Sequence, residues 1–375
     1  MSSTIDMVHP LCYHSNDMAM ISRKLHVKLP TDCVVAVTYI CNSKCTMCDF
    51  WKETRKPTVT LDDYRKLPAT LRDINVSGGE PFLHPQIVDI VRVLHETCPK
   101  ARITISTNAF LTDLTVKRVT DILKFYPAIG IRISIDGVGD MHERVRRIPQ
   151  ALEKDLATLR ALKTIGVRDL GLAYTMSEEN ADHLTKVYDL ARAEGVDFTS
   201  AVAQSSDFYF GGKQIERRAE AQAIAREFDA VIRQQLWSWH PKQWVRAYFT
   251  NGLKRLALEN VQVLPTRAGT DFFFLDPFGV VYPSVVHPSE MGNLHDAATF
   301  AELWKSDAAV QARDVVRRWK RPYWMVCTAR TAIRRNAPRV IAWIIRQRIA
   351  TLGRGSAPPI ASMTHAVPSH APTIS

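Results

Sequence analysis

Residues 41–48 read Cys-Asn-Ser-Lys-Cys-Thr-Met-Cys, three cysteines in the spacing CxxxCxxC directly after an apolar run that ends at Ile40. An iron–sulfur cube is usually bound by four cysteine thiolates. Three thiolates, from Cys41, Cys45 and Cys48, hold three irons and leave the fourth free to bind another molecule, as in an open catalytic metal site. The spacing therefore predicts one [4Fe–4S] cluster with an open iron.

Two other interpretations of the three cysteines are a partial zinc site and plain thiols of a reduced protein. Zinc sites usually add a second pair of Cys or His ligands, whereas the other cysteines of the seven in the chain are scattered singly. The odd total, and an N-terminus without a signal-peptide pattern, argue against a secreted disulfide framework. We therefore expect a reducing, cytoplasmic location.

A second motif, Val-Ser-Gly-Gly-Glu-Pro-Phe at residues 76–82, follows another strand-like run. Its two glycines, Gly78 and Gly79, let a backbone pass close to a ligand. The adjacent carboxylate of Glu80 can accept hydrogen bonds from an ammonium group. Alone, this motif is also compatible with a plain turn. Its position one strand–helix unit after the cysteines favours a ligand-binding role.

The next two strand-like runs also end in polar side chains. Ser106 and Asn108 end the first of them, and Ser134 and Asp136 end the second. In β/α barrels the catalytic groups lie at the C-terminal ends of the strands, which is where these residues fall. Strand-end capping is the alternative role for each of them.

Strand-like and helical segments alternate through the first half of the chain. Strand-like runs lie near 33–40, 72–77, 102–106, 131–135, 168–174 and 197–203, and helical patterns lie near 86–97, 112–124, 151–165 and 181–194. Such an alternation predicts an α/β protein with a parallel sheet covered on both faces. An ordinary doubly wound sheet is the alternative architecture, but it gives the cysteines no role.

Together, these motifs resemble the signature of the radical S-adenosylmethionine (radical SAM) superfamily over about residues 33–205. That signature is CxxxCxφC with φ usually aromatic; here φ is Met47, an apolar and adaptable substitute. The family's TNG motif has Ala109 in place of its glycine. The resemblance implies a partial (β/α)6 TIM-like barrel, a [4Fe–4S] cluster on the three cysteines, and S-adenosylmethionine bound to the open iron. The residues that it places around this cofactor are Met47, Gly78, Gly79, Glu80, Ser106, Asn108, Ser134 and Asp136.

The region 266–330 resembles the SPASM or twitch extension of the same family, which carries auxiliary iron–sulfur clusters in many relatives. Where those relatives have ligand cysteines, this chain has Thr266, Ser284 and Tyr323, and only Cys327 remains. Hydroxyls and a phenol do not replace soft sulfur ligands. We therefore expect a small twitch-like α+β subdomain that has no auxiliary cluster.

The net charge of +11 is concentrated near the C-terminus. Residues 338–351 combine an apolar helical stripe with interspersed arginines, a pattern typical of a helix on an anionic membrane surface, or of a helix packed on the barrel. No apolar run is long enough to span a membrane, and no recognised nucleic-acid motif accompanies the charge. The expected organisation is an N-terminal segment (1–32), the core barrel (33–205), a helical connector (206–265), the twitch-like subdomain (266–330), the basic amphipathic helix (331–354) and a disordered tail (355–375).

The resemblance implies an enzyme that cleaves S-adenosylmethionine reductively and abstracts hydrogen from an unactivated C–H. An external one-electron reductant, such as flavodoxin or ferredoxin, would supply the electron. The substrate is unidentified, and a sugar or a lipid-linked glycan is one expectation; the outcome is epimerisation, dehydrogenation or rearrangement. Cys327 is a candidate hydrogen donor for an epimerase, or else a small buried hydrophobe. The alternatives are a SPASM-type maturase of ribosomal peptides and a non-catalytic scaffold.

Overall fold

The computed structural model describes residues 27–206, 209–212 and 220–353. The predicted N-terminal segment up to residue 26 and the predicted tail at 355–375 lie outside these described residues. The six predicted strands are β1 (Asp32–Thr38), β2 (Asp73–Gly78), β3 (Arg102–Thr107), β4 (Gly130–Ser134), β5 (Asp169–Met176) and β6 (Asp197–Val202). The four predicted helices are α3 (Ile87–Thr97), α4 (Thr112–Leu123), α6 (Ala151–Thr164) and α7 (Leu184–Ala193). Shorter elements that were not predicted are α2 (Leu61–Arg65), α5 (Asp140–Arg146), η1 (Phe50–Lys52), η2 (Pro81–Leu83), η3 (Ala181–His183) and η4 (Tyr209–Gly212).

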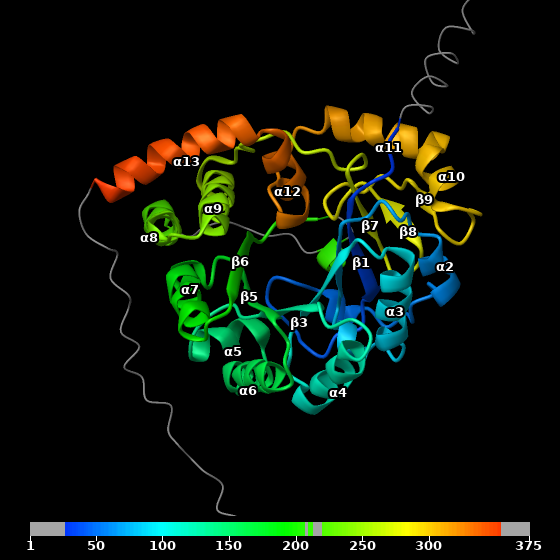
Figure 1. Cartoon of the computed structure of the whole chain (residues 1–375), viewed down its shortest axis with the longest axis horizontal. Coiled ribbons are helices and arrows are strands. Elements are labelled where there is room, and N and C mark those ends of the chain that lie inside the picture. Colours follow the sequence, from blue (N-terminus) through cyan, green and yellow to red (C-terminus); the bar gives the residue numbers. More distant parts are fainter. Residues whose placement is uncertain (1–26, 207–208, 213–219, 354–375) are drawn as a thin grey trace, which may run out of the picture.

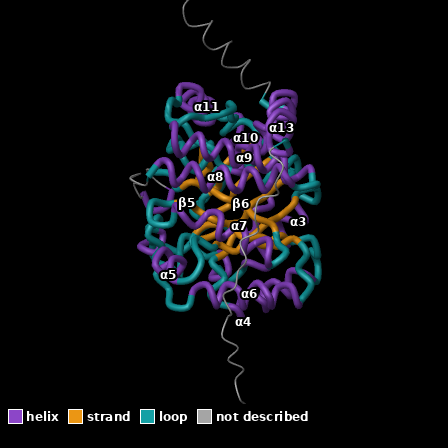
Figure 2. Tube along the Cα trace, turned by 90° about the vertical axis from the view of Figure 1, so that its left-hand side faces the viewer, coloured by secondary structure: helices purple, strands orange, loops and turns teal. Residues whose placement is uncertain are grey.

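The six strands run parallel in the order β6-β5-β4-β3-β2-β1. Figure 1 shows the helices in an arc around the strands, and the turned view of Figure 2 shows the strands in the interior, with helices and loops around them. β6 has no partner strand beyond β5 among the described residues, so the sheet stays open between β6 and β1. The predicted α/β class and partial barrel are confirmed.

Apolar and polar side chains alternate along the strands. The apolar ones pack outward against the helices, and the polar ones point into the barrel. On β2 and β3, the apolar Ile74, Val76 and Ile103 are fully buried in the large hydrophobic core shared with the helices. The residues between them are polar and line an internal cavity, as Asn75 and Thr104 do. Because successive side chains of a strand point to opposite faces, this pattern gives an apolar outer layer and a polar lumen.

A hairpin extends the sheet beyond β1. β7 (Phe272–Leu275) pairs in parallel with β1 and antiparallel with β8 (Val280–Tyr282), and β9 (Gly292–Asn293) follows. A turn at 276–279 joins β7 to β8, and the Asp276 carboxylate accepts hydrogen bonds from the backbone of Phe278 and Val280 at 2.9 and 2.8 Å. The region 266–330, which we predicted to be twitch-like, therefore shares its strands with the barrel sheet. Its helices are α10 (Phe300–Lys305) and α11 (Asp307–Arg318).

Four helices cover the open side of the barrel: α8 (Ala221–Trp237), α9 (Pro241–Glu259), α12 (Val326–Arg335) and α13 (Ala337–Leu352). α9 packs on β6 and α12 packs on β1, so these two helices flank the gap in the sheet (Figure 1). α13 lies across α8 and α9, with Val340 and Ile344 buried against them. Within the described ranges, no helix is long and apolar enough to cross a membrane.

Candidate active site

The cysteine loop, residues 41–48, follows the C-terminal end of β1. All three of its cysteines are free; Cys45 is buried, and Cys41 and Cys48 are half-buried. The loop turns at its end, where the backbone N–H of Cys48 donates to the carbonyl of Cys45 at 3.2 Å. The loop thus presents three available thiols at the C-terminal end of the barrel.

The two glycines of the second motif pack directly under this loop. The backbone N–H of Gly79 donates to the carbonyl of Thr38 at 2.7 Å, and that of Glu80 donates to the carbonyl of Ile40 at 2.9 Å. A Cβ atom on Gly79 would lie 2.3 Å from the Ile40 oxygen and 2.5 Å from that of Tyr39. Glycine is therefore required here by the close approach of two backbones, and this contact positions the cysteine loop.

The carboxylate of Glu80 ties the ends of β2 and β3 together. It accepts hydrogen bonds from the backbone of Phe82 at 2.9 Å, from the Thr107 hydroxyl at 2.9 Å and from the backbone of Asn108 at 2.7 Å. Burial raises the pKa of this carboxyl, and the three bonds counteract that effect. An ionised carboxylate can accept about four hydrogen bonds, so acceptor capacity remains for an ammonium group of a ligand.

Hydrogen-bond donors surround the sulfurs of the cysteine loop. The Asn108 amide donates to Cys41 Sγ at 3.8 Å, Arg146 Nη1 donates to Cys45 Sγ at 3.5 Å, and the Ser43 hydroxyl lies 3.0 Å from the same sulfur. Such donors stabilise negative charge on sulfur. Burial, together with the nearby Glu80 carboxyl and the other two thiols, raises the pKa of Cys41 to about 12, so metal binding would have to displace a proton from this thiol.

Arg146, on the last turn of α5, was not identified from the sequence. Its guanidinium is buried between Cys45 and the Asp136 carboxylate, which lies 2.6 Å away. Its carbonyl accepts a hydrogen bond from the Ser43 hydroxyl at 3.0 Å, and the neighbouring Val145 carbonyl accepts one from the backbone of Thr46 at 2.9 Å. The end of α5 therefore holds the cysteine loop at several points.

Asp136 is fully buried, and its carboxylate faces protein groups: Arg146 and the backbone N–H of Thr175, which donates at 2.7 Å. Behind it, His142 Nδ1 accepts from the backbone of Asp136 at 2.9 Å and His142 Nε2 lies 2.8 Å from Asp155. Burial keeps the pKa of His142 well below its ordinary value. The network therefore assigns a neutral ring whose Nε2–H donates to Asp155, and it fixes α5 against α6.

The remaining predicted residues are spread over three places. Met47 is buried in a small apolar cluster with Cys45, Met141 and Val145. Ser134 is half-buried at the C-terminal end of β4. Ser106 lies deeper in the barrel, where its hydroxyl donates to Asn75 Oδ1 at 3.0 Å. Ala109, where the family has glycine, adopts a left-handed backbone with φ 56°.

Cys327, on the first turn of α12, lines the internal cavity together with Ser106. Thr266, Ser284 and Tyr323, the positions at which the resemblance expects auxiliary-cluster ligands, bond with neighbouring side chains. The Thr266 hydroxyl donates to the Tyr323 hydroxyl, Ser284 Oγ lies 2.7 Å from His287 Nδ1, and the Tyr323 and His287 rings are 4.9 Å apart. Thr266, Ser284 and Tyr323 are thus linked to one another through hydrogen bonds and through the ring of His287.

The cysteine loop fits an iron–sulfur cube better than a single ion. Among the described residues, no three His, Cys, Asp or Glu side chains converge closely enough for one metal ion. In a cube, by contrast, each thiolate binds a different iron, so the sulfurs stay apart. Three free thiols on one loop, with donors aimed at two of the sulfurs, suit that arrangement.

Comparison with known proteins agrees with this site. The sequence model of the Radical SAM superfamily matches residues 35–191. The GTP 3′,8-cyclase of Chlorobaculum tepidum is 33% identical over 138 residues, which are 33% of this chain and 40% of that protein. The pre-heme d1 synthase of Dinoroseobacter shibae is 27% identical over 333 residues, 78% of this chain and 77% of that protein. The match thus spans less than half of the cyclase and about three quarters of the synthase.

The fold has solved relatives as well. The crystal structure of Streptococcus suis SuiB bound to S-adenosylmethionine has a TM-score of 0.57 to this chain at 14% identity, covering 78% of this chain and 69% of that one. The family uses a [4Fe–4S] cluster and S-adenosylmethionine, as predicted from the cysteine spacing and the accompanying motifs. The matched segment includes the cysteine loop, the Gly-Gly-Glu motif and the polar strand ends described above. Residues 35–191 of the chain therefore match the radical SAM superfamily, the family that the motifs resemble.

Proposed function

We propose that this protein cleaves S-adenosylmethionine reductively and abstracts a hydrogen atom from an unactivated C–H of its substrate. The cysteine loop is the observation that carries this proposal, because it presents three free thiols with donors from Asn108 and Arg146. When bound, the cluster and S-adenosylmethionine supply the one-electron reduction and the hydrogen-abstracting group. The electron comes from an external reductant such as flavodoxin or ferredoxin.

The residues of the chain hold and protect these groups. Cys41, Cys45 and Cys48 would bind three irons, and Glu80, which retains acceptor capacity, would receive the amino group of S-adenosylmethionine. Aromatic rings cover the outer side of the loop: Phe50 stacks on Tyr39 with ring centroids 4.3 Å apart and meets Tyr209 edge-on at 5.0 Å. Such a layer excludes water and oxygen from the site, which the reaction requires.

The other predicted cofactor residues fall into two groups: some would contact the cofactor, and others position the residues that do. Asn108 and Ser134 stand at strand ends beside the loop, where they would contact the cofactor. Gly78, Gly79 and Asp136 act through the protein: the glycines allow the backbones to approach, and Asp136 holds Arg146. Met47 fills space behind Cys45. We assign these four residues to positioning.

Cys327 is the hydrogen donor that we propose for the substrate radical. It lies on the cavity wall, and burial raises the pKa of its thiol to about 12. The thiol therefore stays protonated at neutral pH and keeps a hydrogen atom to give. Transfer to a carbon radical would form a C–H bond and leave a sulfur radical, which needs reduction by the external reductant and a proton before the next turnover. This outcome corresponds to epimerisation.

A lipid-linked substrate is supported by the outer face of α13. Ile341, Ile345 and Ile349 follow one another at helical spacing and are each more than half exposed. The arginines between them and the exposed Trp239 beside the helix are typical of an interfacial helix. We propose that α13 contacts an anionic membrane surface and that the enzyme acts on a sugar or a lipid-linked glycan.

The test is transfer of deuterium from substrate to cofactor. Reconstituted, reduced protein is incubated with S-adenosylmethionine and deuterated candidate sugars, lipid-linked glycans or peptides, and 5′-deoxyadenosine is analysed by mass spectrometry. Deuterium from a glycan supports the proposal, and deuterium from a peptide supports the second candidate, a ribosomal-peptide maturase. If the reduced protein forms no 5′-deoxyadenosine under any of these conditions, the chain is a non-catalytic scaffold and the proposal is wrong.

A further inference from the structure

A cavity of about 1660 Å³ runs through the barrel from the end opposite the cysteine loop. Small-molecule sites usually measure roughly 300–1,000 Å³, so this cavity accommodates a larger ligand. It begins at the first residues of the strands, such as Asp73, Arg102 and Asp197, and reaches Ser106. Four residues of a strand span about 13 Å, so Arg102 and Ser106 mark most of the depth of the barrel.

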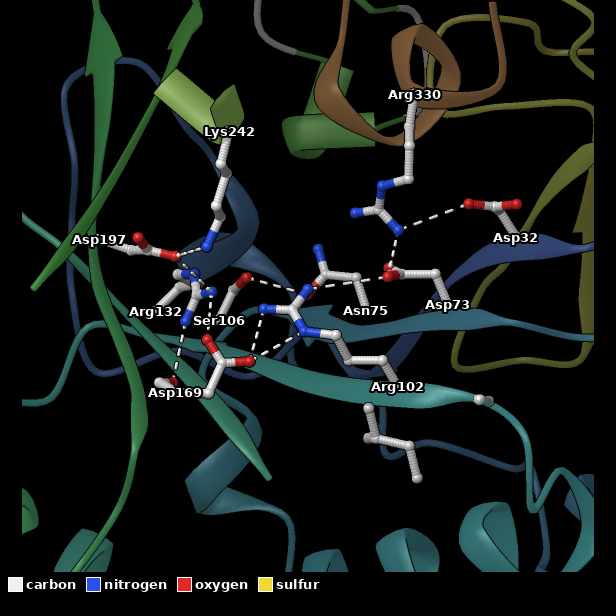
Figure 3. Close-up of polar contacts among 12 residues, drawn as sticks. Asp32, Asp73, Asn75, Arg102, Ser106, Arg132, Asp169, Asp197, Lys242 and Arg330 are labelled. Atoms are coloured by element: carbon white, nitrogen blue, oxygen red, sulfur yellow. Dashed lines mark hydrogen bonds and ion pairs between the residues drawn. The ribbon is translucent and has the colours of Figure 1, made fainter. Parts of the chain in front are cut away.

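The cavity wall is strongly cationic. Nine of its lining residues are Lys or Arg, against four Asp and no Glu. The four carboxylates hold the inner cations in fixed positions, as Figure 3 shows. Asp169 lies 2.6 Å from both Arg102 and Arg132, and Asp197 lies 2.6 Å from Lys242 and 2.9 Å from Arg246.

On the opposite wall, Arg330 reaches down from α12 into the same opening (Figure 3). It pairs with Asp32 at 3.5 Å and with Asp73. Each of the four inner carboxylates is therefore already paired with at least one cation of the wall. Arg168 and Arg334 also line the cavity, and neither has an ion pair with a described residue. Both are exposed at the mouth.

An excess of fixed positive charge along a confined wall attracts a ligand of opposite charge. Arginine in particular binds phosphate and carboxylate through paired hydrogen bonds. A neutral ligand would leave Arg168 and Arg334, which have no ion pair with a described residue, without a counter-charge. The same cavity carries Ser106 and Cys327 farther in, so a ligand anchored at the mouth extends toward the cysteine end of the barrel.

We propose that the substrate carries at least two anionic groups, phosphates or carboxylates, and that these bind at the N-terminal mouth of the barrel to Arg334 and Arg168, with Arg330 and Lys242 on opposite sides of the same opening. This inference rests on the proposed function, because it assigns the substrate class for the same barrel. The remainder of the substrate lies along the lumen, where Ser106 provides a polar contact. A diphosphate and a polycarboxylate share this chemistry, and the test separates them.

The test measures binding of inorganic pyrophosphate and of citrate to the reconstituted full chain by calorimetry. At least one of them should bind, and more weakly as salt rises. Arg334→Gln and Arg168→Gln should each weaken that binding by roughly tenfold, as expected for loss of one charge-assisted hydrogen bond. The matched control is Arg65→Gln, an arginine on α2 outside the cavity, which should leave binding unchanged.

Preference for pyrophosphate identifies a phosphorylated substrate, and preference for citrate identifies a polycarboxylate. Absence of binding by either anion, or equal weakening by Arg65→Gln, overturns the proposal. Iron content of every variant confirms that the fold is intact. Formation of 5′-deoxyadenosine by the wild-type protein is measured separately, so that failure of the anion site and failure of the radical SAM assignment are distinguished.

Discussion

Arg146 places a positive charge against the sulfur of Cys45, and Asp136 holds it there. A cation and a hydrogen bond at a ligand sulfur stabilise the reduced, more negative form of a cluster. Replacing both charges, Arg146→Gln with Asp136→Asn, removes this effect without leaving a buried carboxylate unpaired. We expect the reduction potential to fall by roughly 60 mV or more, the one-electron equivalent of about 1.4 kcal/mol. Potentiometric titration monitored by EPR measures it; Arg144→Gln, on the same helix, is the control.

Gly79 is the residue on which the position of the cysteine loop depends most directly. A Cβ at this position clashes with backbone oxygens, which cannot move aside as side chains do. Overpacking costs typically about 1–3 kcal/mol, and here it would displace the ligand loop. We expect Gly79→Ala to lose most of its iron, whereas Gly353→Ala, at the end of α13, where an added Cβ would lie 3.3 Å from its nearest neighbour, should retain it. Full iron content in Gly79→Ala would show that the loop is not set by this contact.

Cys327 separates two outcomes of the reaction. If its thiol donates hydrogen, Cys327→Ala should still form 5′-deoxyadenosine and abstract hydrogen, but the inverted product should disappear. Product analysis by chiral chromatography, run beside Cys98→Ala as a buried cysteine outside the cavity, measures this. Unchanged product would discard the hydrogen-donor role and favour dehydrogenation or rearrangement.

At the scale of elements, the strands and long helices follow from local patterns, because alternation and helical periodicity depend on neighbouring residues. The role of α5 does not: Arg146 and Cys45 are 101 residues apart in the sequence, and nothing in a short, charged helix marks it as a partner of the cysteines. The same holds for Asp136, whose side chain turns toward Arg146. The cysteine spacing and the glycine pair, in contrast, could be recognised from the sequence, because each motif lies within a few consecutive residues.

The amphipathic helix combines both of the roles that its pattern allows. Val340 and Ile344 pack on α8 and α9, while Ile341, Ile345 and Ile349 are exposed. Truncation would damage the packed face, so point changes test the exposed one. Burying an Ile side chain is worth about 1.5–3 kcal/mol, so Ile341→Ser/Ile345→Ser/Ile349→Ser should reduce binding to anionic vesicles more than tenfold.

Sedimentation with phosphatidylserine-containing vesicles measures this binding, and neutral vesicles and added salt serve as controls, since surface electrostatics are screened by salt. Two results would exclude α13 as a membrane contact: wild-type protein that does not bind anionic vesicles, or a triple variant that binds them as tightly as the wild type does. In that case the exposed isoleucines serve another purpose.

At the scale of the whole molecule, our proposals assign a role to each end of the barrel. The cysteine loop, the Gly-Gly-Glu turn and Arg146 lie at the C-terminal end of the strands, and the cationic mouth lies at the N-terminal end. The helices α9 and α12 close the open side between them. In the proposed arrangement, a substrate anchored at one end would extend toward the cofactor at the other. The cavity could not be predicted from the sequence, because its wall combines single residues from strands and helices that are far apart in the chain.

Iron content per chain is the measurement that tests the central claim most directly. After anaerobic reconstitution, the wild-type chain should contain about four irons, one cube's worth, and the Cys41→Ala/Cys45→Ala/Cys48→Ala variant should contain none. Cys327→Ala should match the wild type. Eight irons in the wild type would contradict a single cluster, and undiminished iron in the triple variant would contradict the assignment of these three cysteines as its ligands.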